Sequence, residues 1–228
     1  MSAIDTLIFD WDGTLADSVG HIVRAMQGAS EAVGLSVPSA HAVRGIIGLA
    51  LPEAAATLFP RDRQLWVALV DAYRDFYLSG EQAPVALFPG VREALDSWRA
   101  QGFRLAVATG KGRNGLVRIL EQHDMLDYFD ATRCADEAVS KPDPAMLYQL
   151  LDELGASSST ALMVGDSGFD IQMAHNAGMC ALAVSYGAQS REQLLAFGPM
   201  DCIDVFAEMP VWLQANRVVA GHNMIERV

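Results

Sequence analysis

Thr6-Leu7-Ile8-Phe9-Asp10-Trp11-Asp12-Gly13-Thr14 is the stretch of this chain that decides its fold. It begins with a short apolar run that stops at an acidic residue, which is typical of a buried strand in a parallel sheet. Gly13 permits the tight turn that must follow. In an extended segment, side chains two residues apart share a face, so Asp10 and Asp12 can reach one common group. The stretch predicts a strand that brings two carboxylates to one edge of a sheet.

Three further runs have the length and composition of buried strands, at 103–108, 161–164 and 180–184. Between them, apolar residues recur at helical spacing, as in Val91, Ala94, Leu95 and Trp98. Strands that alternate with helices predict an α/β fold, a Rossmann-like parallel sheet with helices on both faces.

One region interrupts this alternation. Residues 16–83 contain no convincing strand, but helical patterns cover about 17–34, 40–47, 52–58 and 62–79. An insertion of this length is too long for a loop, so it predicts a small all-helical domain at 16–83, hinged near 14–18 and 80–85. The Rossmann-like core then comprises 1–15 and 84–228. We expect the aromatic stripe of Trp66, Tyr73 and Tyr77 to belong to the core of the helical domain.

Composition excludes several classes of function. The chain has 228 residues, with 16 Lys and Arg against 28 Asp and Glu, and a formal charge of −12. Nucleic acid and anionic membrane surfaces require clustered positive charge, so neither is expected as a partner. No apolar stretch is long enough to span a membrane, the N-terminus does not resemble a signal peptide, and three cysteines are too few for a disulfide framework. We therefore expect a cytoplasmic protein.

Polar side chains follow the predicted strands at their carboxyl ends. They are Asp10 and Asp12, Thr109 and Gly110, Lys141, and Asp166 and Asp170. In parallel sheets these ends converge, and clustered carboxylates require a cation; hard oxygen ligands favour Mg²⁺. Such a site suits a phosphoryl group, which the metal and lysine neutralise while a carboxylate attacks phosphorus.

The simpler interpretation is that the aspartates only cap helices. Lys111 and Arg113 could edge the pocket, although a solvated helix start is expected more often.

The chain resembles the haloacid dehalogenase-like hydrolases, in particular their capped phosphatases, and its pattern is most similar to the phosphoglycolate phosphatases. The motifs are Asp10-x-Asp12-Gly13-Thr14, Thr109-Gly110, Lys141-Pro142 and Gly165-Asp166-Ser167-x-x-Asp170. The resemblance implies Asp10 as nucleophile, Asp12 as general acid and base, and Thr109 and Lys141 as catalytic partners. It also implies Mg²⁺ held by Asp10, the Asp12 backbone carbonyl and Asp166, with Asp170 as a supporting or water-mediated ligand.

The substrate side of the site is expected to include Gly110, Gly48 in the cap loop, and Arg44 as the nearest cation. Dehalogenases of this superfamily lack the second aspartate, and its phosphonate hydrolases use a cap lysine that this chain does not have. Sugar phosphomutases remain an alternative, although they carry a basic residue where this cap has Leu51. Receiver domains of signalling proteins have about half this length and no helical insertion. The sequence thus predicts hydrolysis of a small phosphorylated metabolite by a monomer or homodimer.

Overall fold

The computed structural model describes residues 3–79 and 85–216. Its centre is a six-stranded parallel sheet with strand order β3-β2-β1-β4-β5-β6. The strands are β1 (Thr6–Phe9), β2 (Arg104–Ala108), β3 (Ala131–Arg133), β4 (Ala161–Gly165), β5 (Cys180–Val184) and β6 (Asp201–Ile203). The predicted α/β fold is confirmed. The sequence pattern missed the two edge strands, because each has only three residues and a polar end, Arg133 or Asp201.

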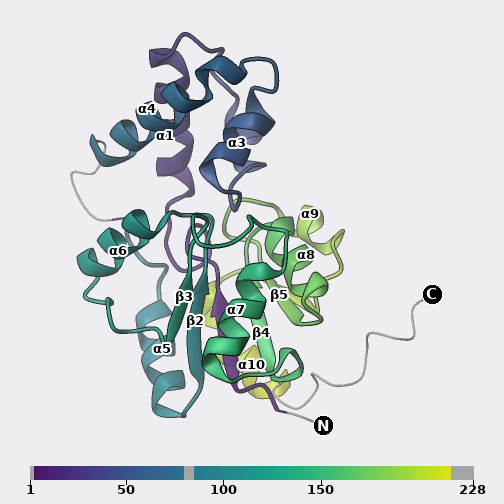
Figure 1. Ribbon diagram of the computed structural model, residues 1–228. Coiled ribbons are helices and arrows are strands. Elements are labelled where there is room, and N and C mark those ends of the chain that lie inside the picture. The colour runs from purple at the N-terminus through teal and green to yellow at the C-terminus, as the bar shows by residue number, and fades with distance from the viewer. Residues whose placement is uncertain (1–2, 80–84, 217–228) are drawn as a thin grey trace.

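Helices cover both faces of this sheet (Figure 1). Leu7 and Phe9 of β1 face one hydrophobic cluster, whereas Ile8 between them faces the other, as the alternation of strand side chains requires. The first cluster includes residues of α5 (Val91–Ala100), α6 (Arg113–Gln122) and α10 (Met209–Asn216). The second includes residues of α7 (Ala145–Leu154), α8 (Gly168–Asn176) and α9 (Arg191–Leu195). The described residues also contain short 3₁₀ turns, η1 (Arg63–Leu65), η2 (Ser158–Thr160) and η3 (Phe206–Glu208).

Residues 19–79, here called the cap, form a helical group above the sheet in Figure 1. Its helices are α1 (Val19–Ala32), α2 (Ala40–Arg44), α3 (Leu51–Leu58) and α4 (Trp66–Ser79). They bury a hydrophobic cluster of their own, in which Leu69 and Ala55 are fully covered. All four predicted helical segments are found, with bounds shifted by a few residues. The predicted hinge near 80–85 and the domain boundary at 83 and 84 fall largely on residues 80–84, outside the described residues.

The register of the sheet brings the functional ends of the strands to one level. Phe9 of β1 is paired with Val107 of β2 on one side and with Val164 of β4 on the other. The backbone N–H of Asp10 continues this pairing, donating to the Val164 carbonyl at 2.9 Å. Residues that follow β1, β2 and β4 therefore meet at the edge of the sheet beneath the cap.

Cys134, Cys180 and Cys202 carry free thiols. Among the described residues, no helix has the length and apolar character that crossing a membrane would require.

Candidate active site

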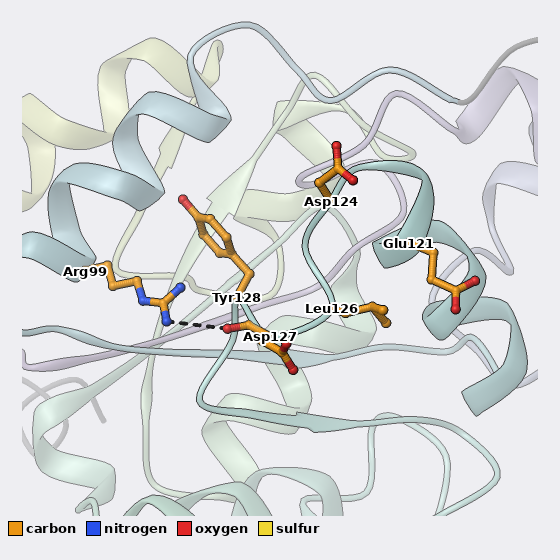
Figure 2. Close-up of a pocket in the computed structure, with 6 residues that line it drawn as sticks. All are labelled: Arg99, Glu121, Asp124, Leu126, Asp127 and Tyr128. Carbon is orange, nitrogen blue, oxygen red and sulfur yellow. Dashed lines mark hydrogen bonds between the residues drawn. The ribbon is translucent and has the colours of Figure 1, made fainter.

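Two cavities of the described residues are candidate sites. One, of about 460 Å³, lies where α6 ends and the chain turns towards β3, at the amino ends of the strands. Figure 2 shows its acidic side chains Glu121, Asp124 and Asp127, together with Arg99, which donates to the Asp127 backbone carbonyl. The other, of about 770 Å³, lies between the cap and the carboxyl ends of the strands. Only the second contains residues of the sequence motifs, Asp10 and Asp12 among them.

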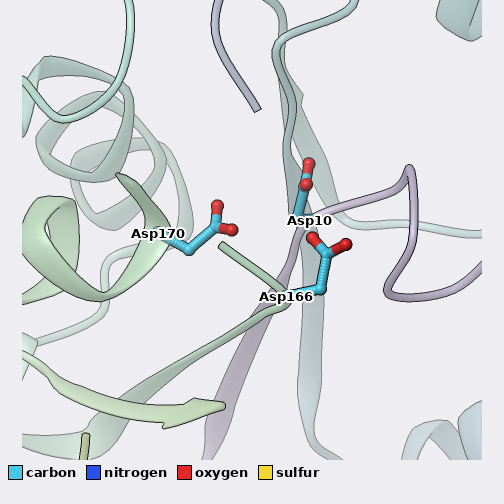
Figure 3. A group of neighbouring side chains, drawn as sticks. All are labelled: Asp10, Asp166 and Asp170. Atoms are coloured by element: carbon cyan, nitrogen blue, oxygen red, sulfur yellow. The ribbon is translucent and has the colours of Figure 1, made fainter. Parts of the chain in front are cut away.

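Three carboxylates converge beneath this larger cavity. Asp10 follows β1, Asp166 follows β4, and Asp170 lies in the first turn of α8. One oxygen of each lies within 4.8 Å of the others, and all three residues are buried. Figure 3 shows the three carboxylate groups directed towards a common space. The predicted convergence of Asp10, Asp166 and Asp170 is therefore present in the tertiary structure.

Lys141 supplies positive charge to this cluster from a fully buried position. Its Nζ lies 2.9 Å from Asp10 Oδ1 and 2.6 Å from Asp170 Oδ1. Burial acts to lower the pKa of Lys141, but the charges of Asp10 and Asp170 outweigh it and raise that pKa above its usual range. The two carboxylates therefore favour the charged form of Lys141 beside Asp10.

Asp170 uses both of its carboxylate oxygens within the protein. Oδ1 accepts from Lys141, while Oδ2 accepts from the Ser167 backbone N–H at 3.1 Å and from the Ser167 hydroxyl at 2.6 Å. The bond from the Ser167 N–H is part of a capping box at the start of α8. Together these contacts favour a role for Asp170 in positioning Lys141 over a role as the principal metal ligand.

Asp10 and Asp166 are less well satisfied. Within the described residues, Asp10 Oδ2 and Asp166 Oδ1 accept no hydrogen bond, although both atoms are buried. Burial raises the pKa of Asp10 to about 7 despite the attraction of Lys141, and burial followed by the repulsion of Asp10 raises the pKa of Asp166. A bound cation would relieve both the desolvation and the repulsion.

The donor set fits Mg²⁺. Four carboxylates, those of Asp10, Asp12, Asp166 and Asp170, face two ammonium groups, those of Lys111 and Lys141, which leaves two negative charges uncompensated when all are ionised. The unpartnered atoms of these carboxylates are hard oxygens, and among the described residues neither a histidine nor a cysteine joins the cluster of Asp10, Asp166 and Asp170. Glycine keeps the site open, because a Cβ at Gly13 would lie 1.9 Å from Asp166 Oδ2 and one at Gly187 would lie 2.2 Å from it.

The cap is seated directly on the loops that carry the motifs. The cap-loop backbone packs so closely on Gly110 that a Cβ there would lie 2.6 Å from the carbonyl oxygens of Gly48 and Leu49. Next along the cap loop, the Ala50 N–H donates to the Ser140 hydroxyl at 3.0 Å. Gly48 and Gly110 both line the cavity, while Thr109, directly after β2, is fully buried.

Two basic residues lie elsewhere than expected. Arg44 is not among the residues that line the cavity; its Nη1 donates to the Gly187 carbonyl at 3.2 Å and so connects the cap to the core. Lys111, expected more often at a solvated helix start, is instead 12% exposed and lies 2.9 Å from Asp12 Oδ2. Tyr73 and Tyr77 pack in the hydrophobic cluster of the cap, as expected, and also line the cavity. The approach of Tyr77 on α4 helps to shield Lys111 from water.

Comparison with known proteins agrees with this geometry. The model of the haloacid dehalogenase-like hydrolase family matches residues 7–184, which include all four motifs. The chain belongs to this family. The hydrolase is 36% identical over 208 residues to a protein of Dickeya dadantii named "Probable phosphatase IndB", covering 89% of this chain and 90% of the relative. It is 32% identical over 215 residues to the phosphoglycolate phosphatase of Vibrio parahaemolyticus, covering 90% and 94%.

Solved structures extend the likeness to the whole fold of the hydrolase. A haloacid dehalogenase-like hydrolase from Bacteroides fragilis superimposes with a TM-score of 0.83 at 26% identity, over 90% of this chain and 99% of the other. The sheet and the helical insertion are therefore those of the family. The expected membership of this hydrolase superfamily, and with it the expectation of an enzyme, is confirmed.

Proposed function

We propose that this enzyme is a Mg²⁺-dependent phosphatase that hydrolyses a small-molecule phosphomonoester through an aspartyl-phosphate intermediate. The observation that carries the proposal is the environment of Asp10. Its carboxylate lies beside the buried Lys141, lines a cavity beneath the cap, and has one oxygen to which none of the described residues donates a hydrogen bond. A nucleophile needs such an oxygen.

Asp10 and Asp166 would hold the metal with their carboxylates, and Asp12 with its backbone carbonyl. Asp170 would support them by fixing Lys141. When bound, Mg²⁺ neutralises the phosphoryl oxygens and the carboxylates around them, which lowers the electrostatic barrier to attack by an anion.

The proposed chemistry has two steps. In the first, an Asp10 oxygen forms a bond to phosphorus while the bond from phosphorus to the leaving oxygen breaks; Asp12 gives that oxygen its proton. In the second, Asp12 takes a proton from water, the water oxygen attacks phosphorus, and the bond to Asp10 breaks with its electron pair returning to the carboxylate. Lys141 and the hydroxyl of Thr109, with the N–H of Gly110, would compensate charge on the phosphoryl group in both steps.

The cap side of the cavity favours hydrolysis over sugar phosphomutase chemistry. Its loop, Gly48 to Pro52, offers Leu49 and Leu51 to the cavity and contains no basic residue. The leaving group would therefore meet an apolar loop, while Arg74 of α4 also lines the cap side of the cavity. The name of the relative from Vibrio parahaemolyticus makes phosphoglycolate the first substrate to test.

A substrate panel tests this function. The purified enzyme should release inorganic phosphate from p-nitrophenyl phosphate and from at least one small phosphomonoester among phosphoglycolate, sugar phosphates and nucleotides, with pyrophosphate as a non-ester comparison. EDTA should abolish release, and added Mg²⁺ should restore it. Absence of phosphate release across the panel would overturn the proposal, and isomerisation of a sugar phosphate without release would favour the mutase alternative.

A further inference from the structure

Lys111 connects the catalytic loop of the core to the cap. It follows Thr109 and Gly110 directly in sequence, and its ammonium reaches back across the site to Asp12 Oδ2 at 2.9 Å. Only 12% of each side chain is exposed. Water and salt screen such a shielded ion pair much less than one on the surface.

The ion pair with Lys111 gives the two oxygens of the Asp12 carboxylate different surroundings. Oδ2 is held by Lys111, whereas buried Oδ1 has no hydrogen-bond partner among the described residues. The last torsion of an aspartate side chain has a broad range of favourable angles, so a contact is needed to fix the carboxylate. Because both oxygens belong to one planar group, the contact to Oδ2 also fixes the direction of Oδ1. The free oxygen belongs to a residue that lines the same cavity as Asp10.

The cap holds Lys111 from the other side. Tyr77 of α4 places its ring centroid 4.6 Å from Lys111 Nζ, a cation–π contact, and its hydroxyl 3.3 Å from the same atom. The Tyr77 ring is in turn packed edge to face on His21 at 4.5 Å, and His21 Nε2 lies 2.8 Å from the Tyr77 carbonyl. The Lys111 ammonium therefore lies between the Asp12 carboxylate of the core and the Tyr77 ring of the cap, and His21 packs against that ring.

We infer that Lys111 is a positioning residue, which holds Asp12 with Oδ1 available for proton exchange when the cap lies on the core. The inference rests on the proposed phosphatase function. In the first step, Asp12 delivers its proton from Oδ1 to the leaving oxygen, which takes the electron pair of the broken bond to phosphorus. In the second, the same oxygen accepts a proton from the attacking water. Lys111 touches neither phosphorus nor the leaving group in this scheme, and acts through Asp12 alone.

The replacement Lys111→Met tests the inference, because methionine keeps most of the side-chain volume and removes the charge. With a phosphorylated aliphatic alcohol from the panel, whose leaving oxygen needs a proton, first-turnover rate should fall roughly 10²-fold, the usual contribution of a positioned acid. With p-nitrophenyl phosphate, whose leaving oxygen needs no proton, the first turnover should change by less than about fivefold. Steady-state turnover of this ester should still be slow, and phosphorylated enzyme should accumulate on rapid quenching.

Companion variants separate positioning from other roles. Lys111→Arg should recover part of the loss, since it restores the cation. Tyr77→Phe keeps the ring face and should act weakly, whereas Tyr77→Leu removes it and should reproduce the same difference between the two esters in milder form. Arg61→Met removes a positive charge from an exposed part of the cap and serves as the charge control, with rates equal to those of the unmodified enzyme.

Two outcomes would overturn the inference. Equal losses in the first turnover of both esters would indicate a structural role, and an increase in KM with unchanged kcat would indicate direct binding of substrate. If the alkyl esters are not substrates, the inference is tested by whether the Lys111→Met variant accumulates phosphorylated enzyme from p-nitrophenyl phosphate. Absence of this accumulation would overturn it. Failure of the proposed function itself is distinguishable, because the unmodified enzyme would then hydrolyse neither ester.

Discussion

Lys141 Nζ lies 2.6 Å from Asp170 Oδ1, and the other oxygen of the same carboxylate caps α8. The helix start thereby fixes the position of the cation that faces Asp10. Since Lys141 and Asp170 are both fully covered, neither charge can be compensated by water.

Lys141→Met should therefore destabilise the fold as well as abolish activity. Removing one member of a buried ion pair costs about 3–5 kcal/mol, because its partner stays charged and desolvated. Adding Asp170→Asn should cost less than the sum of the two single changes. Chemical denaturation of the two single variants and the double variant measures this, and additivity within about 0.5 kcal/mol would contradict the coupling.

Asp10→Asn tests the assigned nucleophile. The amide has nearly the same shape but cannot attack phosphorus, so kcat should fall by about 10³-fold or more while the fold is kept. Circular dichroism and kcat measured side by side check both parts. Asp152→Asn, at an exposed position of α7, is the matched control and should leave both unchanged. Substantial residual turnover by the Asp10 variant would place the nucleophile elsewhere.

Metal binding should depend on pH through Asp10. Its pKa is raised to about 7 by burial, so below this value the folded protein holds a proton that Mg²⁺ must displace. In the unfolded chain the Asp10 carboxyl ionises at about pH 4. The contribution of Asp10 to the stability of the metal-free fold is therefore lost as pH rises from about 4 to about 7, and Asp10 causes no further loss above pH 7. The stabilisation of the fold by Mg²⁺ should instead increase as pH rises.

Thermal unfolding measures this dependence. The increase in Tm on adding Mg²⁺ to the EDTA-treated protein should be larger at about pH 8 than at about pH 5.5. Asp10→Asn should weaken the dependence, because the amide does not titrate in this range. A Mg²⁺-induced shift that is the same at both values would disprove the link between Asp10 protonation and metal binding.

Gly110→Ala should disturb the seating of the cap. The added methyl group would lie 2.6 Å from two backbone carbonyl oxygens of the cap loop, which have no flexible side chain that could move aside. Because small displacements of the groups around a substrate cost large factors in rate, kcat/KM should fall by about tenfold or more. Gly20→Ala is a suitable control, since its Cβ would meet only the flexible end of Arg24 at 3.4 Å.

Much of the fold could be read from local patterns. The four longer strands are continuous apolar runs because both faces of a parallel sheet are buried, and the cap helices show helical spacing because one side packs inward. The same reasoning did not predict the edge strands β3 and β6. Each is only three residues long, and Arg133 and Asp201 interrupt the apolar signal.

The candidate site divides in the same way. By itself, the sequence determined the residue types and the order of the four motifs, and the parallel sheet places strand ends together, so the grouping of Asp10, Asp166 and Lys141 was predictable. Only the tertiary structure decided what each oxygen contacts. Lys111 pairs with Asp12, Arg44 turns to Gly187, and both oxygens of Asp170 are already engaged. The physical reason is that periodicity and strand order act along the chain, whereas contacts such as those of Lys111 with Asp12 and of Arg44 with Gly187 join residues that are distant in sequence and meet only in the folded protein.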